Sequence, residues 1–504
     1  MFGNPGSTEL PFLANFPKDF EYFLGLHEGS VVGMATGYSL IAETPAVVNL
    51  HTTAGTGNAM GAIVTAWHAR APLVITAGQQ DRRQISTEPF LWGKQVDFTK
   101  SYVKWSVEPH RSVDVPEALE RAIQIANASP KGPVFVSIPM DGLDDECPAV
   151  EKRHVSGRVA PDPEAIISLG KALSQANRVA LIVGEQVDAS GAMADVVKLA
   201  EKLASPVFLS PLCFRWGFPS NHQLFRGRLP PAMGPLGKIL SMFETVLVVG
   251  SSAFLYYPYV PGPKIGEGTK LFQITEDPME ASRAVAGTSI VGDVSLAVAQ
   301  LLNVVEGKSW SPAPRQNKSG DVPKSVPPTA EFVHRRLAEA LPSNTVIFAE
   351  TPSSGQYLRA QISEPKSFFM TPSGSLGFSM PASVGAALAT DRPVVCLLGE
   401  GSAQYAIQSL WSAATYGGKV TFIVFNNSEY GILKSFAMMY KEEGIPGLEL
   451  PGIDLEGLAK GYGVDYKKVV DPDKIADTIR QAVAGRELCL IDIPIDRSVK
   501  PLLS

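Results

Sequence analysis

The sequence places a carboxylate and an asparagine at the ends of two neighbouring strands, where together they could hold a metal ion and a diphosphate. An apolar run at residues 394–398 stops at Gly399-Glu400-Gly401-Ser402, and a second run at residues 420–425 stops at Asn426-Asn427. Apolar residues recur at helical spacing between the two runs, which predicts a strand, a helix and a second strand. Since parallel strands of such a unit end at the same edge of the sheet, we expect Glu400 and Asn427 to lie side by side there, next to the amino end of the helix. An anion is favoured at that position.

Length and composition are typical of a multidomain protein that acts on small molecules. The 504 residues are too many for one core and indicate about three domains of roughly 150 residues each. Charged residues make up 19% and apolar residues 45%, with a net charge of −6, so we expect no nucleic-acid partner. The cysteines form no C-x-x-C pair, and no apolar run reaches about 18 residues. We therefore expect reduced thiols, no membrane partner and a cytoplasmic location.

Three segments alternate apolar strands with helical patterns, which predicts an α/β protein with doubly wound parallel sheets. We place the domains at residues 1–150, 163–305 and 329–504, with an extended surface linker at residues 306–328. The expected strands include residues 20–24, 46–50 and 73–77, then 179–183, 246–249 and 271–274, then 394–398 and 420–425. Neither G-x-G-x-x-G nor G-x-x-x-x-G-K-[ST] is present, which argues against NAD and nucleoside triphosphates as ligands.

The string Gly399-Glu400-Gly401 followed by Asn426-Asn427 resembles the metal and diphosphate motif of thiamine diphosphate (ThDP) enzymes, which is usually Gly-Asp-Gly and then Asn-Asn. Further similar strings occur in the same order over nearly the whole chain. They are Phe2-Gly3-Asn4-Pro5-Gly6-Ser7, Leu26-His27-Glu28, His51-Thr52-Thr53-Ala54-Gly55-Thr56-Gly57-Asn58-Ala59-Met60-Gly61 and Ser375-Leu376-Gly377-Phe378. The chain thus resembles the ThDP-dependent 2-oxo acid decarboxylases, above all the benzoylformate decarboxylases. This resemblance implies a pyrimidine-binding domain, a central domain without flavin and a diphosphate-binding domain, in that order.

The resemblance implies catalytic roles for three residues of the first segment. Glu28 matches the carboxylate that hydrogen-bonds the pyrimidine ring of ThDP, and the apolar side chains within residues 31–34 are expected to raise its pKa. Ser7 matches the serine that holds the substrate carboxylate, and His51 matches the proton-transfer histidine. Taken singly, such residues are more often helix-end, capping or structural groups.

The resemblance also implies the groups that bind the cofactor and the substrate. Glu400, the Asn427 side chain and the Glu429 backbone carbonyl would coordinate Mg²⁺, a hard ion that prefers oxygen ligands. Leu376 matches the bulky residue that holds ThDP in its bent form. The other expected cofactor contacts are Glu28, Gly374, Gly401, Ser402, Ala403, Asn427, Tyr430 and Gly431. The expected substrate pocket contains Ser7, His51, Tyr257, Leu433 and Phe436, with Phe254 and Ile432 nearby. Without the resemblance, the same residues fit an ordinary turn and plain core packing.

Three features depart from the family pattern. Glu400 stands where an aspartate is usual, and Mg²⁺ tolerates poor octahedral geometry badly, so metal affinity is expected to be affected. Tyr257 stands where a second active-site histidine is usual, and a tyrosine with an ordinary pKa near 10 does not relay protons at neutral pH. The sequence also begins at the strand that carries Phe2, without the helix that normally precedes it.

The resemblance implies a lyase, specifically a ThDP- and Mg²⁺-dependent carboxy-lyase that converts a benzoylformate-like aromatic 2-oxo acid to an aldehyde and CO₂. It further implies a homo-oligomer, a dimer or a tetramer that is a dimer of dimers, with each active site between two subunits. Two alternatives stay open. One is carboligation to 2-hydroxyketones, as in acetolactate synthases, which the loss of the second histidine favours. The other is a ThDP-binding protein with little catalysis, against which the joint presence of Glu28, Ser7 and His51 argues.

Overall fold

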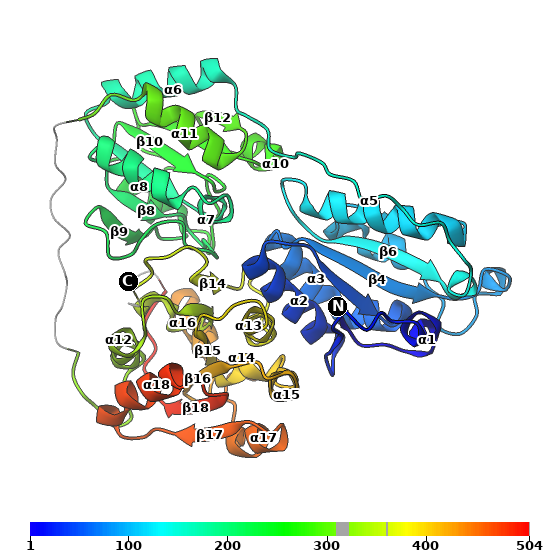
Figure 1. Ribbon diagram of the computed structural model, residues 1–504. Coiled ribbons are helices and arrows are strands. Elements are labelled where there is room, and N and C mark those ends of the chain that lie inside the picture. Colours follow the sequence, from blue (N-terminus) through cyan, green and yellow to red (C-terminus); the bar gives the residue numbers. More distant parts are fainter. Residues whose placement is uncertain (309–321, 359–360, 503–504) are drawn as a thin grey trace.

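The computed structural model describes residues 1–308, 322–358 and 361–502, and it contains three six-stranded parallel sheets covered by helices (Figure 1). This arrangement confirms the predicted α/β class with three doubly wound sheets. The linker predicted at residues 306–328 lies largely outside the described residues. No helix in the described part of the chain is both long and apolar enough to cross a membrane.

The first sheet has the strand order β2-β1-β3-β4-β6-β5. Its strands are β1 (Phe2–Gly3), β2 (Phe23–Leu24), β3 (Ala46–Leu50), β4 (Leu73–Gln79), β5 (Ser106–Val107) and β6 (Val134–Pro139). Its helices are α1 (Leu10–Ala14), α2 (Glu28–Ala42), α3 (Thr52–His68), α4 (Gln95–Thr99) and α5 (Val115–Asn127). The strand expected at residues 20–24 is shorter, because the Phe20 side chain is exposed and only the last two residues pair with β1. The chain leaves β1 toward one edge and β3 toward the other, so the two paths diverge at the carboxyl ends of β1 and β3.

The middle sheet has the order β12-β11-β10-β7-β8-β9. Its strands are β7 (Val179–Val183), β8 (Val207–Leu209), β9 (Phe225–Arg228), β10 (Thr245–Val249), β11 (Lys270–Thr275) and β12 (Thr288–Val291). Its helices are α6 (Pro163–Gln175), α7 (Glu185–Ala189), α8 (Met193–Lys202), α9 (Met233–Leu240), α10 (Pro278–Ser282) and α11 (Val294–Val304). Between β7 and β10, a Cβ added to Gly184 would lie 2.2 Å from the Ser251 Cβ and 2.7 Å from the Gly250 oxygen. The backbone is therefore closely packed at the point between β7 and β10 where doubly wound sheets usually bind ligands.

The third sheet has the order β14-β13-β15-β16-β18-β17. Its strands are β13 (Val346–Glu350), β14 (Phe368–Met370), β15 (Val394–Gly399), β16 (Val420–Asn426), β17 (Asp465–Lys468) and β18 (Cys489–Pro494). Its helices are α12 (Ala330–Ala340), α13 (Ser379–Ala387), α14 (Glu400–Gln404), α15 (Ser409–Tyr416), α16 (Gly431–Tyr440), α17 (Leu455–Gly461) and α18 (Ile475–Ala484). The one helix expected between β15 and β16 is two helices, because the chain turns at residues 405–408 through short-range bonds such as Ser409 N–H to Ala406 O (2.9 Å).

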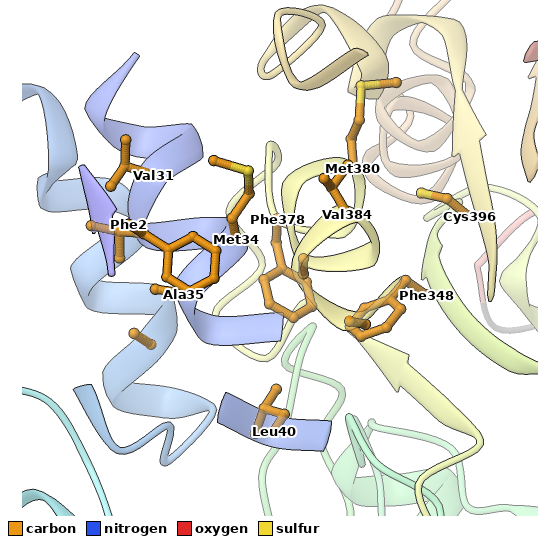
Figure 2. Close-up of a cluster of buried hydrophobic side chains, with 14 of the residues drawn as sticks. Phe2, Val31, Met34, Ala35, Leu40, Phe348, Phe378, Met380, Val384 and Cys396 are labelled. Carbon is orange, nitrogen blue, oxygen red and sulfur yellow. The ribbon is translucent and has the colours of Figure 1, made fainter. Parts of the chain in front are cut away.

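Helices α2 and α13 join the first and third sheets through a shared core (Figures 1 and 2). Met34 of α2 is fully buried in one cluster with Phe378 and Met380, which Figure 2 shows next to it. Glycines allow the two helix backbones to touch. A Cβ on Gly37 would lie 1.9 Å from the Ala382 oxygen, and a Cβ on Gly385 would lie 1.8 Å from the Met34 oxygen. The amino end of α2, which carries Glu28, is thereby fixed relative to the third sheet within one chain.

Candidate active site

A cavity of about 250 Å³ lies at the carboxyl ends of β13 and β15, where the chain leaves the third sheet in opposite directions. Doubly wound sheets bind ligands at this kind of position. Two turns form its walls, one at residues 351–357 after β13 and one at residues 399–402 after β15. The start of α16 and most of the carboxy-terminal residues 495–500 also line the cavity, and the remaining lining comes from residues 322–331, Leu376 and residues 425–430. The described lining residues all come from positions 322–500, so none belongs to the first or middle sheet.

Three polar groups converge at one side of this cavity. The Asn427 side-chain amide lies next to the Glu429 carbonyl oxygen and Glu400 Oε1, and in its hydrogen-bonded orientation Nδ2 donates to both, at 2.9 and 3.3 Å. Turned over, the same amide presents Oδ1 to this point beside the other two oxygens. A carboxylate, an amide oxygen and a backbone carbonyl are the donors that Mg²⁺ prefers. The residues present therefore fit a hard divalent cation.

The Glu400 carboxylate accepts hydrogen bonds from the backbone of residues 427–429, which also contribute proposed metal ligands. Its Oε1 accepts the Glu429 N–H (2.9 Å) and its Oε2 accepts the Asn427 N–H (3.3 Å). This contact follows from the register of β15 and β16, in which Gly399 pairs with Phe425. Burial raises the pKa of Glu400, against the lowering effect of these backbone donors. In the described residues no three His, Cys, Asp or Glu side chains gather as a metal site, which is consistent with a ligand set that uses a single carboxylate.

Most of the residues expected to contact the cofactor line the same cavity. Those that do so are Leu376, Glu400, Gly401, Ser402, Asn427, Glu429, Tyr430 and Gly431. Ala403 is fully buried behind the turn, and Gly374 lies outside the lining, in a turn at φ +75° with open space around its Cβ position. A Cβ on Gly401 would lie 2.8 Å from both the Leu450 and Tyr430 side chains, so this turn needs a glycine. The amino end of α14 thus faces the cavity with its first backbone N–H groups, as an anion requires.

Glu350 fixes the turn that carries Leu376. Its buried carboxylate accepts the N–H groups of Gly377, Phe378 and Ser379 at 2.7, 2.9 and 2.8 Å. Burial raises the pKa of Glu350 to about 7, although the three backbone hydrogen bonds act in the opposite direction. Glu350 therefore anchors both Leu376 and the amino end of α13.

His51 lies at the equivalent position of the first sheet, where β1 and β3 diverge. Its Nδ1 is 2.9 Å from Glu9 Oε2. The Glu9 carboxylate is buried and also accepts the N–H groups of Gly6 and Gly78, both at 2.9 Å, and the Thr8 hydroxyl at 2.5 Å. An acceptor at Nδ1 favours the tautomer that carries its proton there and leaves Nε2 with the lone pair. Sequence reasoning missed Glu9, although its spacing of three residues from Gly6 is that of a helix-capping pair.

Ser7 and Glu28 lie on the same domain as His51. Ser7 is exposed at the start of a short 3₁₀ turn (Ser7–Glu9), and Glu28 is half-buried at the first position of α2. The Glu28 carboxylate accepts a hydrogen bond from Asn58 Nδ2 at 3.1 Å, and Val31 and Val32, three and four residues further along α2, are buried in the core. The expected effect of these apolar residues on Glu28 stays a prediction.

The expected substrate-pocket residues only partly come together. The Tyr257 ring, on the loop after β10, lies 5.3 Å from the Phe436 ring of α16. Leu433 is exposed on α16, and Ile432 lines the cavity. Phe254 is buried in the core of the middle domain and does not line the cavity, because the chain turns inward before Tyr257.

Some lining residues were not expected from the sequence. They are Thr351, Pro352, Ser353 and Ser354 after β13, and Asp496, Ser498, Val499 and Lys500 at the carboxy-terminal end. The first group could have been found as a hydroxyl-rich turn after an apolar strand. The second has no local signal, because its position depends on how the tail folds back over the third sheet.

Comparisons with known proteins agree with this geometry. Three family models match, described as thiamine pyrophosphate enzyme N-terminal TPP binding domain (residues 1–100), central domain (residues 166–301) and C-terminal TPP binding domain (residues 353–493). The chain is 41% identical to the benzoylformate decarboxylase of Pseudomonas aeruginosa, over 98% of this chain and 95% of the relative.

Solved structures give the same picture. The benzoylformate decarboxylase of Polynucleobacter necessarius superposes with a TM-score of 0.96 at 38% identity, over 99% of this chain and 96% of that one. The ThDP-dependent 4-hydroxybenzoylformate decarboxylase of Rhodococcus jostii RHA1 superposes with a TM-score of 0.94, also at 38% identity, over 98% and 96%. The fold, the three matched domains and the close relatives lead to one conclusion: the chain belongs to the thiamine pyrophosphate enzymes, among the carboxy-lyases related to benzoylformate decarboxylase.

Proposed function

We propose that this protein decarboxylates an aromatic 2-oxo acid of the benzoylformate type to the aldehyde and CO₂, with ThDP and Mg²⁺ as cofactors. The observation that carries the proposal is the convergence of the Glu400 carboxylate, the Asn427 side-chain amide and the Glu429 carbonyl beside the amino end of α14. A metal ion held there would bind a diphosphate, which the backbone N–H groups of Gly401 and Ser402 would also contact. When bound, ThDP supplies the electron sink for the loss of CO₂.

The proposed active site is completed by a second copy of the chain. Among the described lining residues of the cavity none belongs to the first domain, whereas Glu28, Ser7 and His51 all lie on that domain. The first domain also exposes large apolar side chains, with Phe90 at 89% and Phe20 at 63%, which a second copy of the chain could cover. A dimer, or a dimer of dimers, would bring these groups to the cavity, and sedimentation of the purified protein tests this.

An aryl side chain on the substrate fits the residues near the cavity mouth. Phe436 and Leu433 lie on α16, and Ile432 on the same helix lines the cavity. The Tyr257 ring against Phe436 adds a second aromatic surface. The names of the similar proteins, benzoylformate and 4-hydroxybenzoylformate decarboxylases, support an aryl substrate.

Proton handling in the proposed reaction belongs to residues of the first domain. Glu28 would hydrogen-bond the pyrimidine ring, and Ser7 would hold the substrate carboxylate. The His51 ring, oriented by Glu9 at Nδ1, has its Nε2 available to take or give a proton.

Tyr257 favours carboligation as the second candidate function. It stands where the family usually has a histidine, and its side chain is exposed beside Phe436. A tyrosine with an ordinary pKa near 10 is a poor proton donor near neutral pH. The product of decarboxylation could then add to a second carbonyl compound instead of being protonated to the aldehyde. A ThDP-binding protein with little catalysis is the third candidate, and the intact Glu9–His51 pair argues against it.

The test is a screen of aryl and alkyl 2-oxo acids with ThDP and Mg²⁺, in which CO₂, aldehyde and 2-hydroxyketone are measured separately. We expect benzoylformate-like acids to give CO₂ and aldehyde in equal amounts. Glu28→Gln is expected to abolish most turnover and to keep the fold, while Glu117→Gln, which changes an exposed glutamate in the first turn of α5, serves as the matched control. Hydroxyketone as the main product would support carboligation, and cofactor binding without any turnover would support the third candidate.

A further inference from the structure

We propose that Arg497, in the carboxy-terminal tail, is a positioning residue that holds the proposed metal-binding loop (residues 426–431, the metal loop) in its cation-binding shape. This inference rests on the proposed ThDP and Mg²⁺ function. It adds a residue from outside the loop, and from outside the sequence motif, to the determinants of metal affinity.

Arg497 contacts the backbone of the metal loop directly. Its Nε donates to the Asn427 carbonyl oxygen at 3.1 Å, and its Nη2 donates to the Ser428 carbonyl oxygen at 3.4 Å. These are the two carbonyls immediately before the Glu429 carbonyl, which is a proposed metal ligand. The guanidinium therefore fixes the peptide planes that lead into the ligand.

The metal loop has a conformation that needs such support. Ser428 has φ +55°, a left-handed conformation that costs free energy for a residue with a side chain. From one side, the Glu400 carboxylate accepts the N–H groups of Asn427 and Glu429. Arg497 binds carbonyls of the same turn. Donors and acceptors on opposite sides of the loop thus select one arrangement of its peptide groups.

Charged side chains join this contact to a second segment. Arg497 Nη1 lies 3.1 Å from Glu449 Oε2, and Lys434 Nζ lies 2.6 Å from Glu449 Oε1 while also pairing with the Glu429 carboxylate. The backbone of residues 448–450 pairs with the metal loop as well, through Tyr430 N–H to Leu448 O (2.8 Å) and Leu450 N–H to Ser428 O (2.9 Å). The loop is held by a network, of which Arg497 is the member contributed by the tail.

The network also balances a buried charge beside the cavity. The Glu429 side chain is only 1% exposed, and its Oε2 has Lys434 and, at 3.9 Å, Arg497 as cationic neighbours. An unbalanced buried carboxylate there would repel a diphosphate. Removing Arg497 therefore weakens metal binding through the loop geometry, and it weakens diphosphate binding through the local charge.

A plain surface ion pair is the competing interpretation, since the Arg497 side chain is 56% exposed and such pairs contribute little to folding. The two interpretations differ in what a substitution changes. A surface pair affects stability slightly and metal affinity not at all, whereas a positioning residue affects metal affinity. Arginine reaches two carbonyls and a carboxylate with its planar fork, and lysine has only one nitrogen for these partners.

The experiment measures Mg²⁺ affinity by calorimetric titration of the metal-free full-length protein at fixed ThDP. We expect Arg497→Gln to raise the half-saturating Mg²⁺ concentration about tenfold, as substitution of partners behind metal ligands does, and Arg497→Lys to recover part of this loss. Arg480→Gln, which removes an exposed pair with Asp477 on α18 of the same domain, is the control and should leave the titration unchanged. Glu449→Gln, at a half-exposed position, is the second variant and should raise the concentration by a smaller factor.

Equal Mg²⁺ affinities for wild type, Arg497→Gln and Glu449→Gln would overturn the inference and leave the proposed function intact. If Arg497→Gln does not fold, the Glu449→Gln titration decides by the same criterion. Failure of the wild-type protein to bind ThDP with Mg²⁺ would instead overturn the proposed function, and the inference with it.

Discussion

Replacing Gly37 by alanine tests whether the contact between α2 and α13 holds the first and third domains together. A Cβ at Gly37 would lie 1.9 Å from the Ala382 oxygen, whereas ordinary contact begins at 3.4 Å. The obstacle is backbone, so no side chain can rotate away. The helices must separate by about 1.5 Å, and the core that they share, which includes Met34 and Phe378, must loosen.

Overpacking of this kind costs typically about 1–3 kcal/mol, and we expect the upper end because the atom that would clash with the new Cβ is a helix carbonyl oxygen. At about 2.1 cal/mol/K of unfolding entropy per residue, each kcal/mol lowers the melting temperature of this 504-residue chain by roughly 1 °C, so a fall of about 3 °C is expected for Gly37→Ala. Cofactor affinity should fall as well, since α2 carries Glu28 and α13 follows the turn of Leu376.

The assay is scanning calorimetry of Gly37→Ala against wild type and a matched control. Gly461→Ala places the same methyl group in α17, where nothing lies within 4 Å of the Cβ position. Alanine is the better helix former there, so the control should melt at the wild-type temperature or slightly above it. If Gly37→Ala melts at the same temperature as the control, the close contact between α2 and α13 is refuted as a source of stability.

Three further substitutions test the two clusters of functional residues. Gly6→Ala places a Cβ 2.0 Å from the His51 Nδ1, so the imidazole must move away from its position. Turnover should fall about 100-fold at an unchanged melting temperature, and normal turnover would contradict the role of His51. Glu350 has its pKa raised to about 7 in the fold, so the folded state holds this proton more tightly than the unfolded state does; its contribution to stability is complete below about pH 4.5 and is lost as the pH rises through 7. Urea unfolding should therefore show that the free energy of unfolding of the wild-type protein falls by up to about 3 kcal/mol between pH 5 and 8 relative to that of Glu350→Gln. Parallel pH profiles of the two proteins would show that Glu350 is not the source of this pH dependence. Glu400→Asp introduces the residue that is usual in the family, but it shortens the side chain by about 1.5 Å and moves the carboxylate away from the N–H groups of the metal loop. Titration should show weaker Mg²⁺ binding than in the wild-type protein. Tighter Mg²⁺ binding would show that the loop moves to meet the shorter side chain.

The fold could be predicted where strands are long, apolar and central. The strands at 46–50 and 179–183 match the structure residue for residue, because runs in which four or all five residues are apolar have few alternatives to a buried parallel strand. The edge strand at β2 was predicted too long, since its side chains meet solvent and pairing with β1 alone sets its length. The break between α14 and α15 depends on local backbone turns within an apolar pattern, which spacing does not reveal.

The site was predictable to the extent that it follows from strand ends. Glu400 and Asn427 meet because β15 and β16 are parallel neighbours, and this needs only the order of the two strands. The burial of Glu9 depends on the N–H of Gly78, about 70 residues away in sequence, and could not be inferred locally. The hydrogen bond from Asn58 to Glu28 joins two helices 30 residues apart in sequence, which local patterns do not reveal.

The middle sheet has a different relation to the chemistry from the other two. Its backbone is closely packed at Gly184 and Gly250, where β7 and β10 end. The loop that leaves β10 carries Tyr257 to the side of α16. Under the proposed function, mutations in this loop would alter which acid is accepted without changing the residues proposed to hold the coenzyme, so substrate preference and coenzyme retention could diverge separately during evolution.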